Sequence, residues 1–189
     1  MSTSSQRMHR IADRMDINDC LCRYARGVDR GDLALVRAAY HPDAYDDHVE
    51  YKGDVDGLIA WLQARFANVD NSVHFLGNSL VEFAGEDSAF VETYFASRRL
   101  RPATPSESPK LAPDDRICRQ SWGRYLDHFE RREGEWRVAR RVVVMEAVFA
   151  TVALGGARHD ASTSWASRGR GDPLYEFRHE VFALAGTTL

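Results

Sequence analysis

The stretch Asn-Ser-Val-His-Phe-Leu-Gly-Asn, residues 71–78, marks the point at which the spacing of apolar side chains changes from helical to extended. Before it, four apolar residues recur at steps of four, three and four: Ile17, Leu21, Tyr24 and Val28. This is the spacing of one buried stripe on a helix. We therefore predict helices before this stretch and strands from it onward.

Three helices are predicted in the first part of the chain. The first ends at Gly31, and the Asp32 side chain can cap the second, which runs from about Leu33 to Tyr40. A short strand follows at about 44–50, and residues 52–54 turn the chain into the third helix. The apolar face of that helix comprises Leu58, Leu62, Phe66 and Val69.

Four long strands are predicted in the second part, at 73–83, 88–98, 117–130 and 136–149. Helices on one side of an antiparallel sheet are typical of an α+β protein. Strong twist would wrap this strongly curved sheet around the three N-terminal helices as a cone. The segment 137–145 is apolar on both faces apart from Arg140 and Arg141. We therefore expect the helices to cover one face and another subunit to cover the other.

The length of 189 residues suits one domain with a substantial core. We take 1–189 as a single domain with a core at about 10–146, a Pro-rich loop at 101–115 and a C-terminal extension at 147–189. The net charge of −3 argues against a nucleic-acid partner, because phosphate binding needs a basic surface. No apolar run approaches the roughly 20 residues that span a bilayer, and the N-terminus is polar. We expect a cytoplasmic protein without a membrane partner.

Asp29 and His74 are the leading candidates for chemistry. Asp29 ends the first predicted helix, where an exposed acid is unfavourable against the helix dipole by roughly 0.3–1 kcal/mol. A carboxylate that contacts an imidazole fixes its tautomer and raises its basicity, so the ring can remove a proton at neutral pH without a metal or cofactor. From the residues alone, a core histidine bonded to a backbone carbonyl is the favoured alternative for His74.

Five segments occur in an order that resembles the SnoaL-like branch of the nuclear transport factor two-like superfamily: 24–32, 40–44, 46–48, 74–78 and 130–141. The first reads Tyr-Ala-Arg-Gly-Val-Asp-Arg-Gly-Asp and the fourth His-Phe-Leu-Gly-Asn. The resemblance covers roughly residues 10–146. Members of that family include polyketide cyclases, scytalone dehydratase and a hexachlorocyclohexane dehydrochlorinase. The resemblance implies a conical pocket and catalysis without a cofactor.

The resemblance also implies roles for single residues. In the dehydratase and dehydrochlorinase members, an Asp at the end of the first helix pairs with a His on the following long strand, and these positions fall on Asp29 and His74. The dehydrochlorinase uses an Arg whose position falls on Arg141. Scytalone dehydratase has a Tyr where this chain has His48 and an Asn where it has Tyr125. These two departures bear on the substrate.

Several candidates keep a structural alternative. Arg141 could form an ion pair with a carboxylate at the rim, and the candidate substrate-binding residues Tyr24, His48 and Tyr125 could belong to the core. Neighbouring strand residues point to opposite faces, so residues 46–48 cannot all converge on one ion, and we expect no metal. The remaining basic cluster is interpreted as a solvated strand end: Arg98, Arg99 and Arg101.

The sequence thus favours a cofactor-independent lyase, either a dehydratase or a related enzyme that eliminates across C–O or C–C bonds. Its substrate would be a hydrophobic or aromatic hydroxylated small molecule, and the pair of Asp29 and His74 would act as the general base. An isomerase or cyclase with the same base is the nearest alternative. A non-catalytic ligand-binding or assembly domain is the alternative outside enzymes. We also expect a homo-oligomer, either a trimer or a dimer.

Overall fold

The computed structural model describes residues 3–104, 106–107, 111–153 and 164–187. Three helices precede the long strands: α1 (Thr3–Arg30), α2 (Leu33–Ala38) and α3 (Val55–Phe66). Two short strands lie between α2 and α3, namely β1 (Tyr40–Asp47) and β2 (Lys52–Asp54). The later elements are β3 (Asn71–Phe83), β4 (Ser88–Pro102), β5 (Arg116–Arg132), β6 (Glu135–Ala153) and α4 (Pro173–Leu184).

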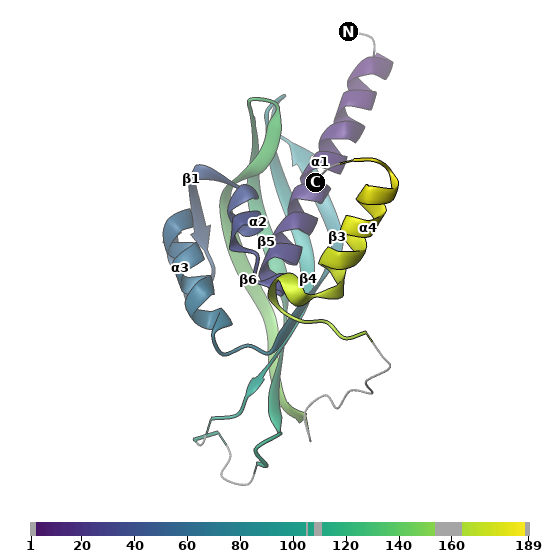
Figure 1. Ribbon diagram of the computed structural model, residues 1–189. Helices are drawn as coiled ribbons and strands as arrows, with labels where there is room; N and C mark the ends of the chain where they lie inside the picture. Colours follow the sequence, from purple (N-terminus) through teal and green to yellow (C-terminus); the bar gives the residue numbers. More distant parts are fainter. Residues whose placement is uncertain (1–2, 105, 108–110, 154–163, 188–189) are drawn as a thin grey trace.

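The six strands form one curved, unclosed sheet in the order β2-β1-β6-β5-β4-β3. Helix α1 runs along this sheet, with α2 and α3 on one flank and α4 on the other (Figure 1). The predicted α+β class, with N-terminal helices packed on a curved sheet, is therefore confirmed. Because α1 spans the sheet, its last turn reaches the start of β3.

One strand pair departs from the predicted antiparallel sheet. β1 runs parallel to β6, with Asp46 opposite Arg141, whereas the other four pairs are antiparallel. The chain enters β1 directly from α2 beside the last strand, and it then turns back through β2. The predicted turn at 52–54 is therefore a short strand, which pairs with residues 45–47.

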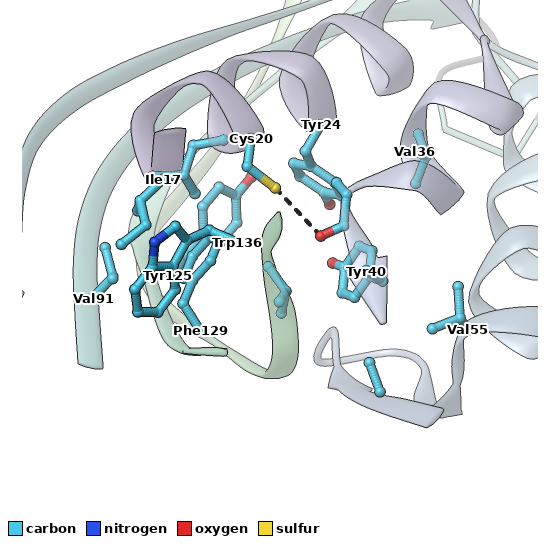
Figure 2. Close-up of a cluster of buried hydrophobic side chains, with 14 of the residues drawn as sticks. Ile17, Cys20, Tyr24, Val36, Tyr40, Val55, Val91, Tyr125, Phe129 and Trp136 are labelled. Carbon is cyan, nitrogen blue, oxygen red and sulfur yellow. Dashed lines mark hydrogen bonds between the residues drawn. The ribbon is translucent and has the colours of Figure 1, made fainter. Parts of the chain in front are cut away.

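The core lies between α1 and the sheet. The stripe predicted on the first helix is buried, and its central residue Tyr24 is 1% exposed. Figure 2 shows Tyr24 facing Tyr40 and Tyr125, whose ring centres lie 5.9 and 5.8 Å away in edge-to-face geometry. Such contacts add about 0.5–1.5 kcal/mol to the burial of the rings. They hold α1 in one position on the sheet and so fix where its last turn lies.

The segment after β6 crosses the C-terminal end of α1. Arg30 donates a hydrogen bond to Oδ2 of Asp172 at 3.1 Å. Arg168 donates to the Val28 carbonyl at 3.2 Å, and a cation stabilises such carbonyls at the end of a helix. These contacts attach the C-terminal segment to the body beside α1.

Among the predicted boundaries that change, two concern the C-terminal half of the chain. β6 continues to Ala153, so residues 147–153 belong to the sheet, and residues 154–163 of the predicted extension lie outside the described residues. β4 and β5 reach Pro102 and Arg116, which shortens the Pro-rich connection. In the described part of the chain, no helix has the length and apolar character needed to cross a membrane.

Candidate functional site

The last turn of α1 brings Asp29 to His74 on β3. Nδ1 of His74 lies 2.7 Å from Oδ1 of Asp29, and the His74 backbone N–H donates to Oδ2 at 2.7 Å. Ser72, two residues earlier on the same strand, donates its hydroxyl to Oδ1 at 3.0 Å. Asp29 is only 6% exposed. The acid and the imidazole singled out in the sequence are therefore in direct contact.

These contacts set the charge of Asp29 and the orientation of the His74 ring. Burial acts to raise the pKa of Asp29, but the hydrogen bonds and charge of His74, together with the Ser72 hydroxyl, outweigh it and lower the pKa. Asp29 is thus ionised at neutral pH. An ionised acceptor keeps the ring proton on Nδ1, so Nε2 of the neutral ring has the free lone pair.

The lowered pKa of Asp29 predicts a pH-dependent stability. A group whose pKa is lower in the folded state stabilises the fold above its unfolded value, near 3.8, and this contribution is lost as the pH falls through the folded value. The Asp29→Asn variant lacks this stabilising contribution at every pH, because its side chain does not ionise. Thermal unfolding should therefore give a gap in Tm between wild type and variant that is large near about pH 6 and smaller near about pH 2.5. A gap that does not change with pH would contradict this.

His74 lines a pocket between α1, α3 and the sheet, with a volume of about 110 Å³. An apolar cavity of about 150 Å³ holds one benzene ring, so the pocket, which is somewhat smaller, is on the scale of a single ring. Phe95 and Tyr125 stack with ring centres 4.4 Å apart and form part of an apolar end. Three serines also line it: Ser72, Ser97 and Ser121.

A second acid and imidazole pair belongs to the same pocket. His48 lines the pocket, and its Nδ1 lies 3.2 Å from Oδ1 of Asp46. Asp46 is 0% exposed and accepts a hydrogen bond from the Tyr40 hydroxyl at 2.6 Å. Asp46 and His48 are separated by one residue at the end of β1, so their side chains lie on the same side of the strand. Asp46 thus orients the His48 ring.

The turn that follows His48 is strained. Val49 has a φ of 66°, in the left-handed region that a β-branched residue rarely adopts. The His48 backbone N–H holds the turn by donating to the Tyr51 carbonyl at 2.7 Å. Strain of this kind persists where surrounding contacts impose it, and it clusters at functional sites. This turn positions His48 and Val49 against the pocket.

Arg141 and Tyr24 lie in the core behind Tyr125, outside the pocket lining formed by the described residues. Arg141 is 0% exposed and donates to both carboxylate oxygens of Asp127, each at 2.7 Å. Its guanidinium lies 4.3 Å from the ring centre of Tyr24 and 4.1 Å from that of Tyr125. Burial acts to lower the pKa of Arg141, but the charge of Asp127 outweighs it and raises the pKa. Arg141 therefore forms an ion pair with a carboxylate, as the structural alternative predicted, but the pair lies in the core and not at the rim of the pocket.

The pocket also contains residues for which no role in the site was predicted from the sequence. Arg99 lines it, whereas its neighbours Arg98 and Arg101 bond Asn71 and Glu107 instead. The interpretation of Arg99 as a solvated strand end is therefore wrong. A signal was present, since every second residue of a strand shares a face. The further missed residues of the lining are Ser72, Arg119 and Arg168, and the role of Asp46 behind His48 was missed as well.

The fold and the site suggest a relationship to a known protein family, and comparison with family models identifies it. The family model of the SnoaL-like domain matches residues 9–142. The chain belongs to the SnoaL-like domain family. An uncharacterized protein of Mycobacterium tuberculosis is 28% identical to this SnoaL-like chain over 140 residues, which are 70% of the chain and 84% of the relative.

Solved structures share the fold of this SnoaL-like protein. A scytalone dehydratase-like protein from Novosphingobium aromaticivorans has a TM-score of 0.64 and 14% identity, covering 86% of this chain and 96% of its own. A hexachlorocyclohexane dehydrochlorinase of type 2 has a TM-score of 0.66 and 16% identity, covering 82% and 99%. Together with the family match, these likenesses confirm the predicted nuclear transport factor two-like cone.

Proposed function

We propose that this SnoaL-like protein is a cofactor-independent lyase of the dehydratase type, with a hydrophobic or aromatic hydroxylated small molecule as substrate. The observation that carries the proposal is the buried contact between Asp29 and His74, which directs the basic nitrogen of the ring toward a pocket of small-molecule size. The dehydratase-like and dehydrochlorinase structures of the same fold support a reaction of the elimination class.

The proposed reaction begins with proton abstraction. Nε2 of His74 removes an acidic C–H proton next to a carbonyl or ring, while Asp29 stabilises the imidazolium that forms. The electrons of the C–H bond become the new double bond, and the C–O bond to the hydroxyl group breaks. General-base catalysis typically contributes about 10²–10⁴-fold. Orientation in a small pocket and exclusion of water supply the remainder.

The departing hydroxyl group needs a proton, and the developing anion needs a hydrogen bond. We assign the proton to His48, which would donate it from Nε2 in its doubly protonated form while its Nδ1–H stays bonded to Asp46. Burial raises the pKa of Tyr125 well above its ordinary value, so its phenol keeps its proton and can donate to the anion. Arg141 and Tyr24 act indirectly, because both contact the ring of Tyr125.

Two other functions use the same site. An isomerase or cyclase would share the proton abstraction and differ only in the fate of the carbanion. A ligand-binding domain would need the pocket without the base, and the two oriented imidazoles favour an enzyme over that alternative.

The test is a panel of hydroxylated aromatic and alicyclic carbonyl compounds, incubated with the protein and a chelator. We expect loss of water from at least one compound, followed by the absorbance of the new conjugated double bond, and deuterium uptake at the acidic carbon in D₂O. Deuterium uptake without loss of water would favour the isomerase. Binding without either signal across the panel would favour the ligand-binding domain.

We further infer a homo-oligomer, either a trimer or a dimer. Large apolar residues are exposed on the outer face of β5 and β6, among them Trp122 at 46% and Phe149 at 50%. Their rings pack edge to face with centres 5.5 Å apart. Light scattering of the purified chain should give a mass of two or three copies, and the mass of a single chain would contradict the inference.

A further inference from the structure

The pocket is basic although the chain has a net charge of −3. One carboxylate, that of Glu50, is among the described residues that line it, and it forms an ion pair with Arg65. The guanidinium of Arg65 also lies 4.4 Å from the ring centre of Trp61. Three further guanidinium groups line the pocket, and none of them forms an ion pair with a carboxylate among the described residues: Arg99, Arg119 and Arg168.

The register of the sheet places Arg99 and Arg119 side by side. They are directly opposite each other on β4 and β5, where Cβ atoms lie about 4.5–5.5 Å apart and like charges destabilise the sheet. Burial and the charges of Arg65 and Arg119 lower the pKa of Arg99 to about 10, so it still carries its charge at neutral pH. Repulsion of this kind is relieved when an anion binds between the two groups.

Two guanidinium groups have buried nitrogens without partners. Nε of Arg119 and Nη1 of Arg168 are buried, and neither has a hydrogen-bond acceptor among the described residues. Buried donors are ordinarily satisfied, because an unmet hydrogen bond is costly. The rest of the Arg168 group is fixed, since it donates to the Val28 carbonyl and lies 4.0 Å from the ring centre of Phe66. The guanidinium group of Arg168 is therefore held in place beside the pocket.

The arginines are aligned with the base. On β4, Phe95, Ser97 and Arg99 line the pocket at steps of two, and Ser97 is opposite His74 on β3. Residues two apart on a strand are separated by roughly 7 Å. Arg99 thus lies about one ring's length beyond His74, and the aromatic end with Phe95 lies about as far on the other side.

We propose that Arg99, Arg119 and Arg168 form an oxyanion subsite, and that the substrate is a small, roughly ring-sized molecule with a carboxylate or phosphate group. Guanidinium groups present paired donors that match two oxygens of such an anion. The apolar end takes the carbon skeleton, and the anionic group fixes the reacting carbon beside His74. This inference rests on the proposed function for the chemistry at His74, and it narrows the substrates from hydroxylated compounds in general to acids.

Binding of simple probes to the full chain tests the subsite. Benzoate, phenyl phosphate and neutral benzamide share one ring and differ in charge, and calorimetry at low ionic strength measures the Kd of each. We expect at least one of the two anions to bind at least about tenfold more tightly than benzamide, because hydrogen bonds to charged groups are the strong ones. The tighter of the two anions identifies carboxylate or phosphate. Added salt should weaken the anions and leave benzamide unchanged.

Two variants locate the effect. Arg119→Met and Arg99→Met should each raise the Kd of the tighter anion about tenfold or more, and each should raise Tm, because repulsion between the two arginines is removed. Arg116→Met is the matched control, since Arg116 also lies on β5 but pairs with Asp70. Anions that bind no better than benzamide, or that bind equally well to both variants and to wild type, would overturn the subsite. If a variant does not fold, the salt dependence of anion binding to the wild type tests the subsite instead, and anion binding that salt does not weaken would contradict it.

His74→Gln separates this inference from the proposed function. The subsite does not need the base, so this variant should keep the wild-type Kd for the anion while losing turnover. Tight anion binding that depends on Arg99 and Arg119, in a protein that turns over no compound, would support the subsite and contradict the lyase. Turnover of neutral compounds only, without anion binding, would contradict the subsite and support the lyase.

Discussion

His74→Gln is expected to lower kcat/KM by about 10²–10⁴-fold on any substrate that the wild type turns over, the contribution of a general base. Glutamine replaces the imidazole with an amide that cannot accept a proton at neutral pH. Its amide N–H₂ can still donate to Asp29, so the carboxylate is not left buried without its partner. The Tm should therefore stay close to that of the wild type, and a loss of rate will report on chemistry.

The measurement is steady-state kinetics with the compound that the substrate panel identifies, with Tm measured in parallel. His128→Gln is the matched control, because His128 lies on β5 with its side chain 44% exposed and bonded to Ser88. The control should keep full activity. Activity in His74→Gln close to that of the wild type would remove the base from the mechanism, whatever the outcome of the binding experiments.

Arg141→Met is expected to lower the free energy of unfolding by about 3–5 kcal/mol. Methionine occupies part of the same volume, but Asp127 would then be a buried charge without its two hydrogen bonds. Arg141 also donates to the Tyr40 hydroxyl at 3.2 Å, so Tyr40 loses a partner in the same variant. Chemical denaturation followed by circular dichroism measures the change.

The double variant Arg141→Met with Asp127→Leu distinguishes an unpaired charge from a packing defect. Replacing both members of a buried ion pair with apolar residues is often neutral or stabilising. The double variant should therefore recover most of the stability that the single variant loses. A loss as large in the double variant as in the single one would mean that the rings around Arg141 need its shape, and not that Asp127 needs its charge.

The helical half was predicted because local patterns are informative there, whereas the meeting of Asp29 with His74 was implied by the resemblance to the SnoaL-like family. A stripe at helical spacing defines which side of α1 is buried, and that side fixes where Asp29 points. The inward position of Arg99 was missed because adjacent arginines on a strand look alike in sequence, and their facing depends on register. Register is a tertiary property, and a one-residue shift reverses every side chain of a strand.

The contribution of the C-terminal segment to the pocket was missed for a different reason. Arg168 reaches the pocket through the end of α1 and the ring of Phe66, across more than a hundred positions of sequence. No periodic pattern around Arg168 indicates such a contact. The role of Asp46 was missed although its partners Tyr40 and His48 are close in sequence, because the inward face of β1 depends on its pairing with β6, which comes much later in the chain.

The parallel pairing of β1 with β6 also has a consequence for how the molecule assembles. The hydrogen bond between Tyr40 and Arg141 joins residues 101 positions apart, and closing so large a loop is slow. During synthesis on a ribosome, β1 can pair with β2 but has no β6 to pair with until almost the whole sheet has emerged. The wall of the pocket that carries His48 is thus expected to form last, after the hairpins of β3 to β6 have paired locally.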